Sequence, residues 1–335
     1  MPNRPPTLMD VARKSGVSHQ TVSRVVNGNI NVSEKTRKKV LKFLEEMGYV
    51  RNQAARSLAT GKSSKIGILG METTLYGPTV IFHDIQVAAR KAGYGLSIEF
   101  TKDVDDFSIS EGINQLVKDG VDGIVLIAPQ ANGSRNLESL KLRIPIIAHE
   151  GKRTDYISIV ASNQFEGGLL ATEHLISLGH KNIGHIGGPL TFYDATERHR
   201  GWKEALARNG LPPARYLVGD WSVESGYRLT FDLLKDLDIT AIFVANDAMA
   251  LGALKAISEL GLKVPENVSL VGYDNEPETP FLIPGLTTVD QRFDLVASKS
   301  IDLLIKLLNK TATKSASKKI SPELLVRASS AAINK

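Results

Sequence analysis

From Ile66 onward, the chain alternates short apolar runs with stretches of helical periodicity, and this alternation constrains the fold more than any other feature. The apolar runs fall into two sets. The first set comprises residues 66–70, 96–100, 123–128, 144–149 and 157–162, and the second comprises residues 182–188, 240–246 and 268–274. Helical stretches such as 80–92 and 165–178 separate the runs.

The runs are apolar at nearly every position, which predicts strands that are buried on both faces. A parallel sheet covered by helices buries both faces, so we expect an α/β core of two doubly wound parallel-sheet subdomains. Ligands in such folds bind beyond the carboxyl ends of the strands. Polar residues that end strands, here Glu150, Asn246 and Asp274, are therefore candidates for a binding site.

The charge of the chain is unevenly distributed. Residues 1–65 contain 13 Lys/Arg and 4 Asp/Glu, whereas the remaining 270 residues contain 28 and 32, within an overall charge of +5. A compact basic segment on a mildly acidic body is typical of nucleic-acid binding. A solvated charged tail is the alternative, but the segment is not of low complexity.

Within the basic segment, the pattern predicts three short helices between residues 7 and 47. Thr7, Ser18 and Ser33 are expected to cap them, since hydroxyl side chains accept hydrogen bonds from free helical N–H groups. Gly16 separates the first two helices, and Gly48 ends the third. A helix, a tight glycine-containing turn and a second helix indicate a helix-turn-helix.

The second of these helices carries the polar residues of interest. With its valines turned inward, Gln20 and Arg24 project side by side because they are four residues apart. In the major groove, Arg can bond to O6 and N7 of guanine, and Gln can bond to N6 and N7 of adenine. The alternative is that both are merely solvated. Four further basic residues are expected to touch phosphates: Lys35, Arg37, Lys38 and Lys39.

Residues 52–60 contain good helix formers and a capping Asn, but too little apolar surface to fold alone. We expect this segment to become ordered on DNA. Leu58 would then act as an apolar wedge between base steps, and Ala55 would permit close approach.

The run TLMDVARKSGVSHQTVSRVVNG, followed by VSEKTRKKV and MGYVRNQAARSLATG, resembles the DNA-binding headpiece of the lac repressor/gal repressor family of bacterial transcription regulators. The resemblance implies that His19, Gln20 and Arg24 read base edges. It also implies a hinge helix in the minor groove, with Asn52 at its start. Arg51 departs from the family, which usually has proline there, and leaves the hinge entry less stiff. Six residues are implied to support the helices or hold phosphates: Thr7, Ser18, Ser23, Asn27, Ser33 and Thr36.

The resemblance extends through the body, where GHKNIGHIGGP, ERHRGW, GDWSVESGY, the ANDAMALGA block and PGLTTVDQRF stand in the family's order. GDWSVESGY and the block after it look most like the lac repressor branch of the family. The family's core is similar to periplasmic sugar-binding proteins, with an effector between two subdomains. Four residues match positions that hydrogen-bond effector hydroxyls: Arg198, Asn246, Asp274 and Gln291. Trp221 and Phe293 match positions that pack on a sugar ring, and Leu75, Pro78 and Ile81 match the N-subdomain lining.

These residue types suit a sugar, because a pyranose has an apolar C–H face for an aromatic ring and a rim of hydroxyls for Asp, Asn and Arg. Core packing remains the alternative for Trp221, and a helix or turn cap is the alternative for Asp274. Three residues depart from the lac repressor branch: Met71 replaces a small hydroxyl residue, Glu150 an aspartate and Ser162 a phenylalanine. A galactoside is therefore one candidate effector among several.

Other functional classes find little support. The chain has no cysteine, which excludes disulfides, thiolate metal sites and thiol nucleophiles. Residues 60–63 resemble the end of a P-loop, but Arg56 occupies the position of a required glycine. His174, His180 and His185 lack the spacing and acidic companions of a metal site. No catalytic motif is found, so we expect no enzyme activity, no cofactor and no metal.

The sequence thus predicts a sugar-responsive repressor that binds a palindromic operator as a homodimer, since leucine heptads for a tetramerising helix are missing at the end of the chain. A regulator with a purine or nucleoside corepressor, a pure solute-binding protein and a sugar-processing enzyme are the alternatives. With no signal peptide or membrane span, a cytoplasmic, nucleoid-associated protein is expected. The expected domains are a headpiece (1–50), a hinge (51–63), an N-subdomain (64–162 and 291–321) and a C-subdomain (163–290 and 322–335).

Overall fold

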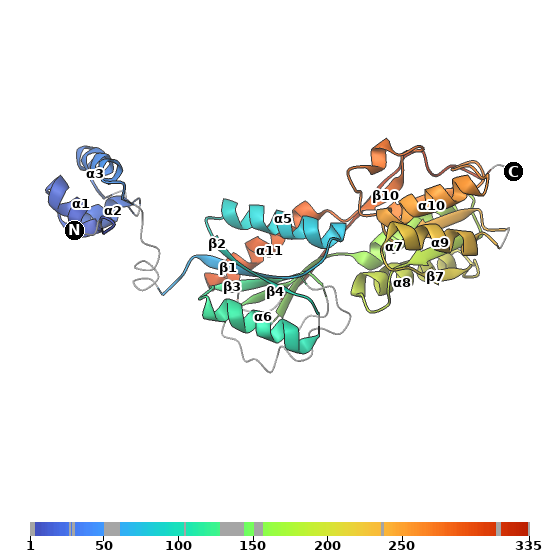
Figure 1. The fold of residues 1–335 in the computed structure, drawn as a ribbon, viewed down its shortest axis with the longest axis horizontal. Helices are drawn as coiled ribbons and strands as arrows, with labels where there is room; N and C mark the ends of the chain where they lie inside the picture. Colours follow the sequence, from blue (N-terminus) through green and yellow to red (C-terminus); the bar gives the residue numbers. More distant parts are fainter. Residues whose placement is uncertain are drawn as a thin grey trace. The chain divides into compact units, whose positions relative to one another are not determined.

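The computed structural model describes residues 4–26, 28, 31–49, 61–103, 105–127, 144–150, 157–235, 238–312 and 316–333. The chain forms two compact units, Met1–Ser63 and Ser64–Lys335 (Figure 1). The expected hinge helix at residues 52–60, with Asn52, Ala55 and Leu58, lies outside the described residues. Asn27 and Arg51 also lie outside them.

The N-terminal unit contains three helices among its described residues: α1 (Leu8–Ser15), α2 (His19–Val26) and α3 (Glu34–Glu46). Each contributes to one small core, in which Val11, Val22, Val25 and Val40 are buried. The predicted helix-turn-helix is confirmed, with Gly16 at φ +64° between the first two helices. Glycine suits this turn because other residues adopt a positive φ only at an energetic cost.

Local hydrogen bonds define where these helices begin. Thr7 and Asp10 form a reciprocal capping box at α1, in which the Thr7 N–H donates to Asp10 Oδ2 at 2.9 Å. At α2, the Thr21 N–H donates to Ser18 Oγ at 3.1 Å. At α3, the Thr36 N–H donates to Ser33 Oγ at 3.3 Å. All three capping hydroxyls predicted from the sequence therefore bind helical N–H groups.

The first half of the larger unit, here called the N-subdomain, is a parallel six-stranded sheet in the order β11-β5-β4-β3-β1-β2. Its strands are β1 (Lys65–Met71), β2 (Gly95–Thr101), β3 (Gly123–Leu126), β4 (Ile146–Ala148), β5 (Ile157–Ser162) and β11 (Ser317–Ile320). Helices α5 (Tyr76–Lys91) and α11 (Phe293–Leu308) cover one face, and α6 (Asp106–Lys118) covers the other (Figure 1).

The C-subdomain has a second six-stranded sheet in the order β12-β10-β9-β8-β6-β7. Its strands are β6 (Ile183–Gly187), β7 (Tyr216–Val218), β8 (Ala241–Val244), β9 (Ser269–Tyr273), β10 (Thr287–Asp290) and β12 (Glu323–Leu325). All pairs are parallel except the antiparallel pair of β10 and β12. One face packs on α7 (Gln164–Ser177) and α8 (Tyr193–Arg208), and the other packs on α9 (Val223–Leu233) and α10 (Asp247–Glu259). A short 3₁₀ helix, η2 (Thr279–Phe281), precedes β10.

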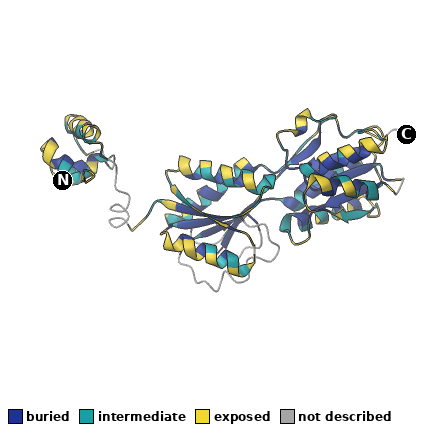
Figure 2. Ribbon diagram, in the orientation of Figure 1, coloured by how far each residue is buried: buried dark blue, intermediate teal, exposed yellow. Residues whose placement is uncertain are grey.

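The two buried sheets confirm the predicted doubly wound core, and Figure 2 shows them as buried layers beneath helices with exposed outer faces. The chain passes between the sheets three times, after Ser162, Asp290 and Ile320. Because the last two passages return late segments to each sheet, both subdomains are built from separate parts of the sequence. No helix among the described residues is long and apolar enough to cross a membrane.

Residues 321–329 (SPELLVRAS) read as a last strand in the sequence, and β12 confirms it, whereas three other strands were not predicted. β7 and β11 are edge strands, and residues 317–319 of β11 are exposed and polar, so they read as part of a Lys/Ser/Ala-rich loop. β10 has the sequence TTVD, in which two threonines are buried without an apolar run. An edge strand needs no continuous apolar stretch, because one side of it has no neighbouring strand.

Candidate functional sites

The polar residues of α2 lie on the outside of the headpiece. His19, Gln20 and Arg24 are all exposed, whereas Val22 and Val25 are buried against the other two helices. The helix therefore presents an amide and a guanidinium, both free of any role in the core, on one exposed face. Such a face has the donors and acceptors that read base edges in the major groove.

The hydroxyl residues that were predicted to support this face are occupied in helix capping. Thr7, Ser18 and Ser33 cap the three helices, and the Ser33 and Thr36 hydroxyls lie 2.8 Å apart. Ser23 is half-buried on α2. Five of the six predicted support residues therefore lie in the headpiece, and the sixth, Asn27, is outside the described residues.

A pocket lies in the larger unit, beyond the carboxyl ends of strands from both sheets. Its volume is about 560 Å³, open space at its mouth included. Fifteen residues line it: Leu75, Tyr76, Gly77, Pro78, Ile127, His149, Glu150, Phe192, Asp194, Arg198, Trp221, Asn246, Asp274, Gln291 and Phe293. Both subdomains contribute, so a bound ligand would touch both.

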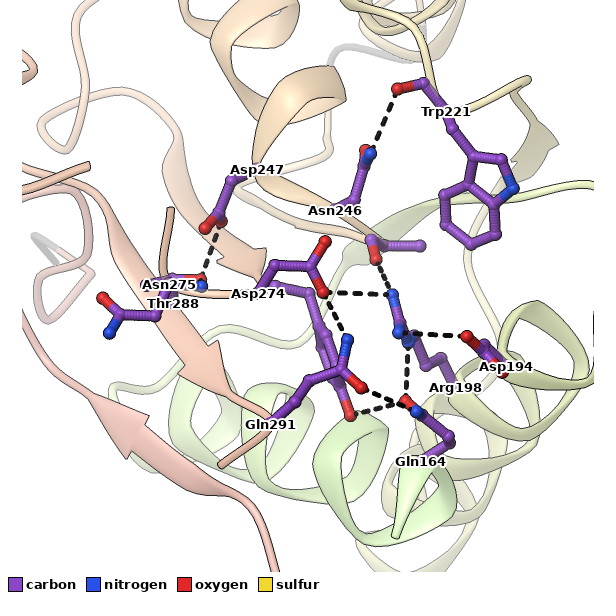
Figure 3. Close-up of polar contacts among 12 residues, drawn as sticks. Gln164, Asp194, Arg198, Trp221, Asn246, Asp247, Asp274, Asn275, Thr288 and Gln291 are labelled. Atoms are coloured by element: carbon purple, nitrogen blue, oxygen red, sulfur yellow. Dashed lines mark hydrogen bonds and ion pairs between the residues drawn. The ribbon is translucent and has the colours of Figure 1, made fainter. Parts of the chain in front are cut away.

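A chain of hydrogen bonds holds the polar wall of the pocket (Figure 3). Gln291 Nε2 donates to Asp274 Oδ1 at 2.5 Å, and Gln164 Nε2 donates to Gln291 Oε1 at 2.7 Å. Arg198 Nε donates to Gln164 Oε1 at 2.9 Å, and Arg198 Nη1 lies 3.8 Å from Asp274 Oδ1. These residues come from α7, α8 and the ends of β9 and β10, so the wall is rigid before any ligand binds.

Arg198 is the centre of this wall and is only 2% exposed. Its Nη1 donates to the Ala245 carbonyl at 2.5 Å, and its guanidinium carbon lies 3.8 Å from the centroid of the Tyr273 ring. Burial by itself would lower the pKa of Arg198, but Asp274 and the other nearby carboxyl groups raise it. Arg198 is therefore charged, and Asp274 compensates part of its charge.

The Asp274 carboxyl is also fully buried. Burial is the largest influence on it and raises its pKa to about 6, although Arg198 and the hydrogen bond from Gln291 oppose the rise. A carboxyl with this pKa accepts hydrogen bonds from ligand hydroxyls at neutral pH, where it carries its charge.

Two aromatic rings form the apolar part of the pocket. Trp221 and Phe293 are each 6% exposed, and the Trp221 and Phe192 rings meet edge to face with centroids 5.8 Å apart. Gly188 lies so close to the indole that a Cβ there would come within 2.2 Å of it. The glycine at this strand end is thus required for the position of the tryptophan.

Asn246 orients this tryptophan. Its Nδ2 donates to the Trp221 carbonyl at 3.0 Å, and its Oδ1 accepts from the Met249 N–H at 3.0 Å and so caps α10. Asn246 therefore links strand end, helix and aromatic wall, with its remaining acceptor capacity facing the pocket.

The opposite wall comes from the N-subdomain. Glu150, just after β4, is buried, and its Oε2 has no hydrogen-bond partner among the residues that the structure describes. Burial, followed by the charge of Asp194, raises the pKa of Glu150 well above its usual value. Burial lowers the pKa of the neighbouring His149, which is therefore neutral near pH 7.

Comparisons with known proteins agree with this architecture. A family model described as bacterial regulatory proteins, lacI family, matches residues 7–52, and a periplasmic binding protein-like domain matches residues 172–330. The lactose operon repressor of Escherichia coli (strain K12) is 36% identical over 314 residues, covering 93% of this chain and 87% of that protein. The chain belongs to the lacI family of bacterial regulatory proteins.

Further relatives of this LacI-family repressor support the same assignment. The repressor PurR of Pasteurella multocida (strain Pm70) is 35% identical over 328 residues, covering 96% of this chain and 98% of that one. A crystal structure of the lac repressor dimer bound to operator and the anti-inducer ONPF matches with a TM-score of 0.87 at 34% identity. That match covers 98% of this chain and 100% of the other. The protein is accordingly a transcriptional repressor and not an enzyme.

The structure of this LacI-family repressor brings together most residues that the sequence singled out for the pocket. Nine of the ten predicted residues line it: Leu75, Pro78, Glu150, Arg198, Trp221, Asn246, Asp274, Gln291 and Phe293. Ile81 is placed elsewhere. It is fully buried in the core between α5 and the N-subdomain sheet.

The structure also adds residues that sequence reasoning missed. Tyr76, Gly77, Ile127, His149, Phe192 and Asp194 line the pocket, and Gln164 supports it from behind. Two of them had a usable signal. Asp194 precedes Arg198 by four residues on α8, which places both on one helix face. His149 is the last residue of the apolar run that directly precedes Glu150.

Proposed function

We propose that this repressor acts as a homodimer on a palindromic operator and is released from it by a small sugar bound in the pocket. The observation that carries the proposal is the pocket itself. It combines a buried Arg198–Asp274–Gln291 wall with the Trp221 and Phe293 rings. A pyranose requires both, since its hydroxyl rim needs paired donors and acceptors while its C–H face needs an apolar surface.

In the DNA-binding half of the proposal, each subunit places α2 in the major groove of one half-site. His19, Gln20 and Arg24 would read base edges there. The expected support residues and the basic side chains of α3 would position the helix on the phosphates without reading sequence. Paired hinge segments, with Asn52, Ala55 and Leu58, would open the central minor groove.

The proposed domain boundaries explain how the two halves communicate. We assign residues 64–162 and 291–321 to the N-subdomain and residues 163–290 and 322–335 to the C-subdomain. A ligand that touches both changes the angle between them, and the N-subdomain directly follows the hinge in sequence. A coupling free energy of about 1–3 kcal/mol between the ligand site and DNA would make a useful switch.

An exposed apolar surface supports the homodimer. Phe281 is 83% exposed and Ile283 is 97% exposed, and Val223 and Leu251 are further exposed apolar residues of the C-subdomain. Large apolar side chains as exposed as Phe281 and Ile283, and only two residues apart in sequence, are typical of an interface with another protein. A dimer also suits a palindromic operator, because two-fold symmetry of the protein matches that of the site. We place the protein in the cytoplasm, associated with the nucleoid.

The test is a mobility-shift assay of the full chain on a palindromic sequence from the promoter region of its own gene. A panel of mono- and disaccharides is then added, galactosides included. We expect at least one sugar to weaken the complex about tenfold, which corresponds to roughly 1.4 kcal/mol. If DNA binds and no sugar changes its affinity, the effector half of the proposal fails while the DNA half stands.

A purine or nucleoside corepressor is the second candidate, and the similarity to PurR proteins favours it. The two candidates predict opposite effects of the ligand on DNA affinity. A corepressor tightens the DNA complex, whereas an inducing sugar weakens it. Adding hypoxanthine, guanine and adenosine to the same assay separates them.

A further inference from the structure

The pocket contains more acidic groups than its single guanidinium can balance. Three carboxyl groups line it, on Glu150, Asp194 and Asp274, and Arg198 is the one Lys or Arg residue among the described lining residues. The adjacent His149 supplies no charge near neutral pH, since burial lowers its pKa. In a buried site such an excess of negative charge is costly unless a cation or a proton compensates it.

Arg198 donates its hydrogen bonds to neutral groups and lies 3.8 Å from Asp274, slightly farther than from Asp194. Its Nε and Nη1 donate to Gln164 and to the Ala245 carbonyl. Its Nη2 lies 3.6 Å from Asp194 Oδ2, well beyond the roughly 2.7–2.9 Å of a charge-assisted hydrogen bond. Asp194 is therefore only partly compensated.

Glu150 and Asp194 come from different subdomains, line the same pocket and are close enough to interact with each other. Glu150 Oε2 and Asp194 Oδ1 are buried, and neither accepts a hydrogen bond from any N–H or O–H group among the described residues. The Glu150 side chain is only 4% exposed. The two groups interact strongly enough to raise the pKa of Glu150 well above its usual range, burial being the larger cause. Burial and the neighbouring Asp194 therefore favour the protonated form of Glu150 by raising its pKa.

We propose that Glu150 and Asp194 form a subsite for a protonated amino group of the ligand, so that the effector is an amino sugar. The inference rests on the proposed function, because it specifies which sugars the pocket selects. The ammonium would donate hydrogen bonds to Glu150 Oε2 and Asp194 Oδ1, which have no donor among the described residues. The ring and its remaining hydroxyls would meet the Trp221 and Arg198–Asp274 side of the pocket.

A hydroxyl group meets these requirements less well. It donates one hydrogen bond and brings no charge, whereas an ammonium donates three and compensates one carboxylate. The same excess of carboxyl groups disfavours sugar phosphates and uronic acids, because like charges repel strongly in a poorly solvated site. The subsite therefore selects for cationic ligands over neutral ones and for neutral ligands over anionic ones.

The experiment uses matched ligands that differ only at one position. Glucosamine is compared with glucose, galactosamine with galactose, and the disaccharide of β-1,4-linked glucosamine with cellobiose. Binding to the full chain is measured by calorimetry at about pH 6.5, below the roughly 7.7–8.0 typical of α-amino groups, so that the amines are protonated. We expect at least one amine to bind tenfold or more tightly than its hydroxyl partner, and its N-acetyl derivative to lose that advantage.

Asp194→Asn keeps the size of the side chain and removes its charge, and we expect it to abolish the preference for the amine. Glu150→Gln imitates the protonated carboxyl and should reduce the preference without reversing it. Glu204→Gln is the matched control. It removes a carboxylate from the same helix, α8, but the side chain lies on the surface beside Arg208, 2.9 Å from its Nε. It should leave the preference unchanged.

The outcomes separate this inference from the proposed function. If a neutral sugar binds as well as its amine, or if Asp194→Asn leaves the ratio unchanged, the amino-sugar inference is wrong and the sugar-responsive repressor remains. If neither member of any pair binds while a purine does, both fail. Tight binding of a phosphorylated sugar would also overturn the inference, since the charge argument excludes it.

Discussion

Arginine and glutamine occur together in two regions of this repressor, under opposite conditions. On α2, Gln20 and Arg24 are exposed, and neither takes part in a buried hydrogen-bond network among the described residues. In the C-subdomain, Gln164 and Arg198 are 2% exposed and bond to each other at 2.9 Å. The first pair has its donors and acceptors available to a partner, whereas the second has most of them occupied by the protein. The same side chains should therefore affect binding alone in one region, and both stability and binding in the other.

The largest expected effect is that of Arg198→Ala. Removing the guanidinium leaves Asp274 and Gln164 buried without their partner, and breaking a buried charged network costs roughly 3–5 kcal/mol. Denaturant unfolding of the full chain should show this loss, and ligand binding should disappear. Arg24→Ala is the control and should leave the unfolding free energy within about 0.5 kcal/mol of the parent. Equal effects of the two variants would remove the distinction between the regions.

Histidine allows the same comparison through pH. Burial lowers the pKa of His185 to about 3, while the hydrogen bond with the Phe243 carbonyl opposes the decrease. Because the folded pKa is below the unfolded value of about 6.5, the unfolded state binds more protons at acidic pH. The contribution of His185 to stability is complete above about pH 6.5 and is lost as the pH falls toward 3.

We therefore expect the parent protein to lose roughly 3 kcal/mol between about pH 7 and pH 4 through this residue. His185→Gln should remove that part of the acid sensitivity, whatever its stability at neutral pH. His19→Gln changes an exposed histidine of α2 and should leave the acid sensitivity intact. The measurement is unfolding by urea at a series of pH values. An unchanged pH profile in His185→Gln would contradict the assignment.

On the DNA side, Arg24→Ala should reduce operator affinity by roughly 1–3 kcal/mol and relax the preference at one base position. The reason is that a guanidinium in the major groove makes paired bonds to one guanine. Lys38→Ala, an exposed basic residue of α3, should instead weaken binding to all sequences alike. Affinities for the operator and its single-base variants decide between the two. A uniform loss with Arg24→Ala would make Arg24 a phosphate contact.

The smallest effect concerns the local stability of the headpiece. Ser33→Ala removes the hydroxyl that caps α3 and should cost about 1 kcal/mol. In the full chain, hydrogen exchange of the α3 amides should then accelerate about fivefold, as that free energy implies. Lys42→Ala changes only a surface pair with Glu46 and should accelerate exchange less. Equal acceleration in the two variants would show that the Ser33 cap stabilises α3 no more than the Lys42–Glu46 surface pair does.

Much of the fold was predictable because it depends on short-range spacing. The caps at Thr7, Ser18 and Ser33 operate over three residues, and the buried strands are uninterrupted apolar runs. Of the strands that were not predicted, β10 and β11 lack such runs, and β7 (YLV) is only three residues long. These segments are strands because they pair with neighbouring strands, and the local sequence does not reveal that pairing.

The candidate site was predictable only in part. Resemblance to the family identified eight of the fifteen lining residues, and the strand-end argument added Glu150. The resemblance also suggested Ile81, which α5 directs into the core. Gln164 was missed because its significance depends on Gln291, which lies 127 residues later in the chain. Asp194 was missed because nothing in its own segment indicates the carboxyl group of Glu150 opposite it.

By itself, the sequence determined the basic headpiece, the helix-turn-helix and the doubly wound core, since periodicity, capping and charge act between neighbours in the chain. It also marked the polar residues that end the strands. Only the tertiary structure decided which of these polar residues hydrogen-bond to one another and which have no hydrogen-bond partner among the described residues. The physical reason is that desolvation and charge compensation depend on everything that packs around a group. Segments that are distant in the sequence form this environment, because the chain passes three times between the two sheets.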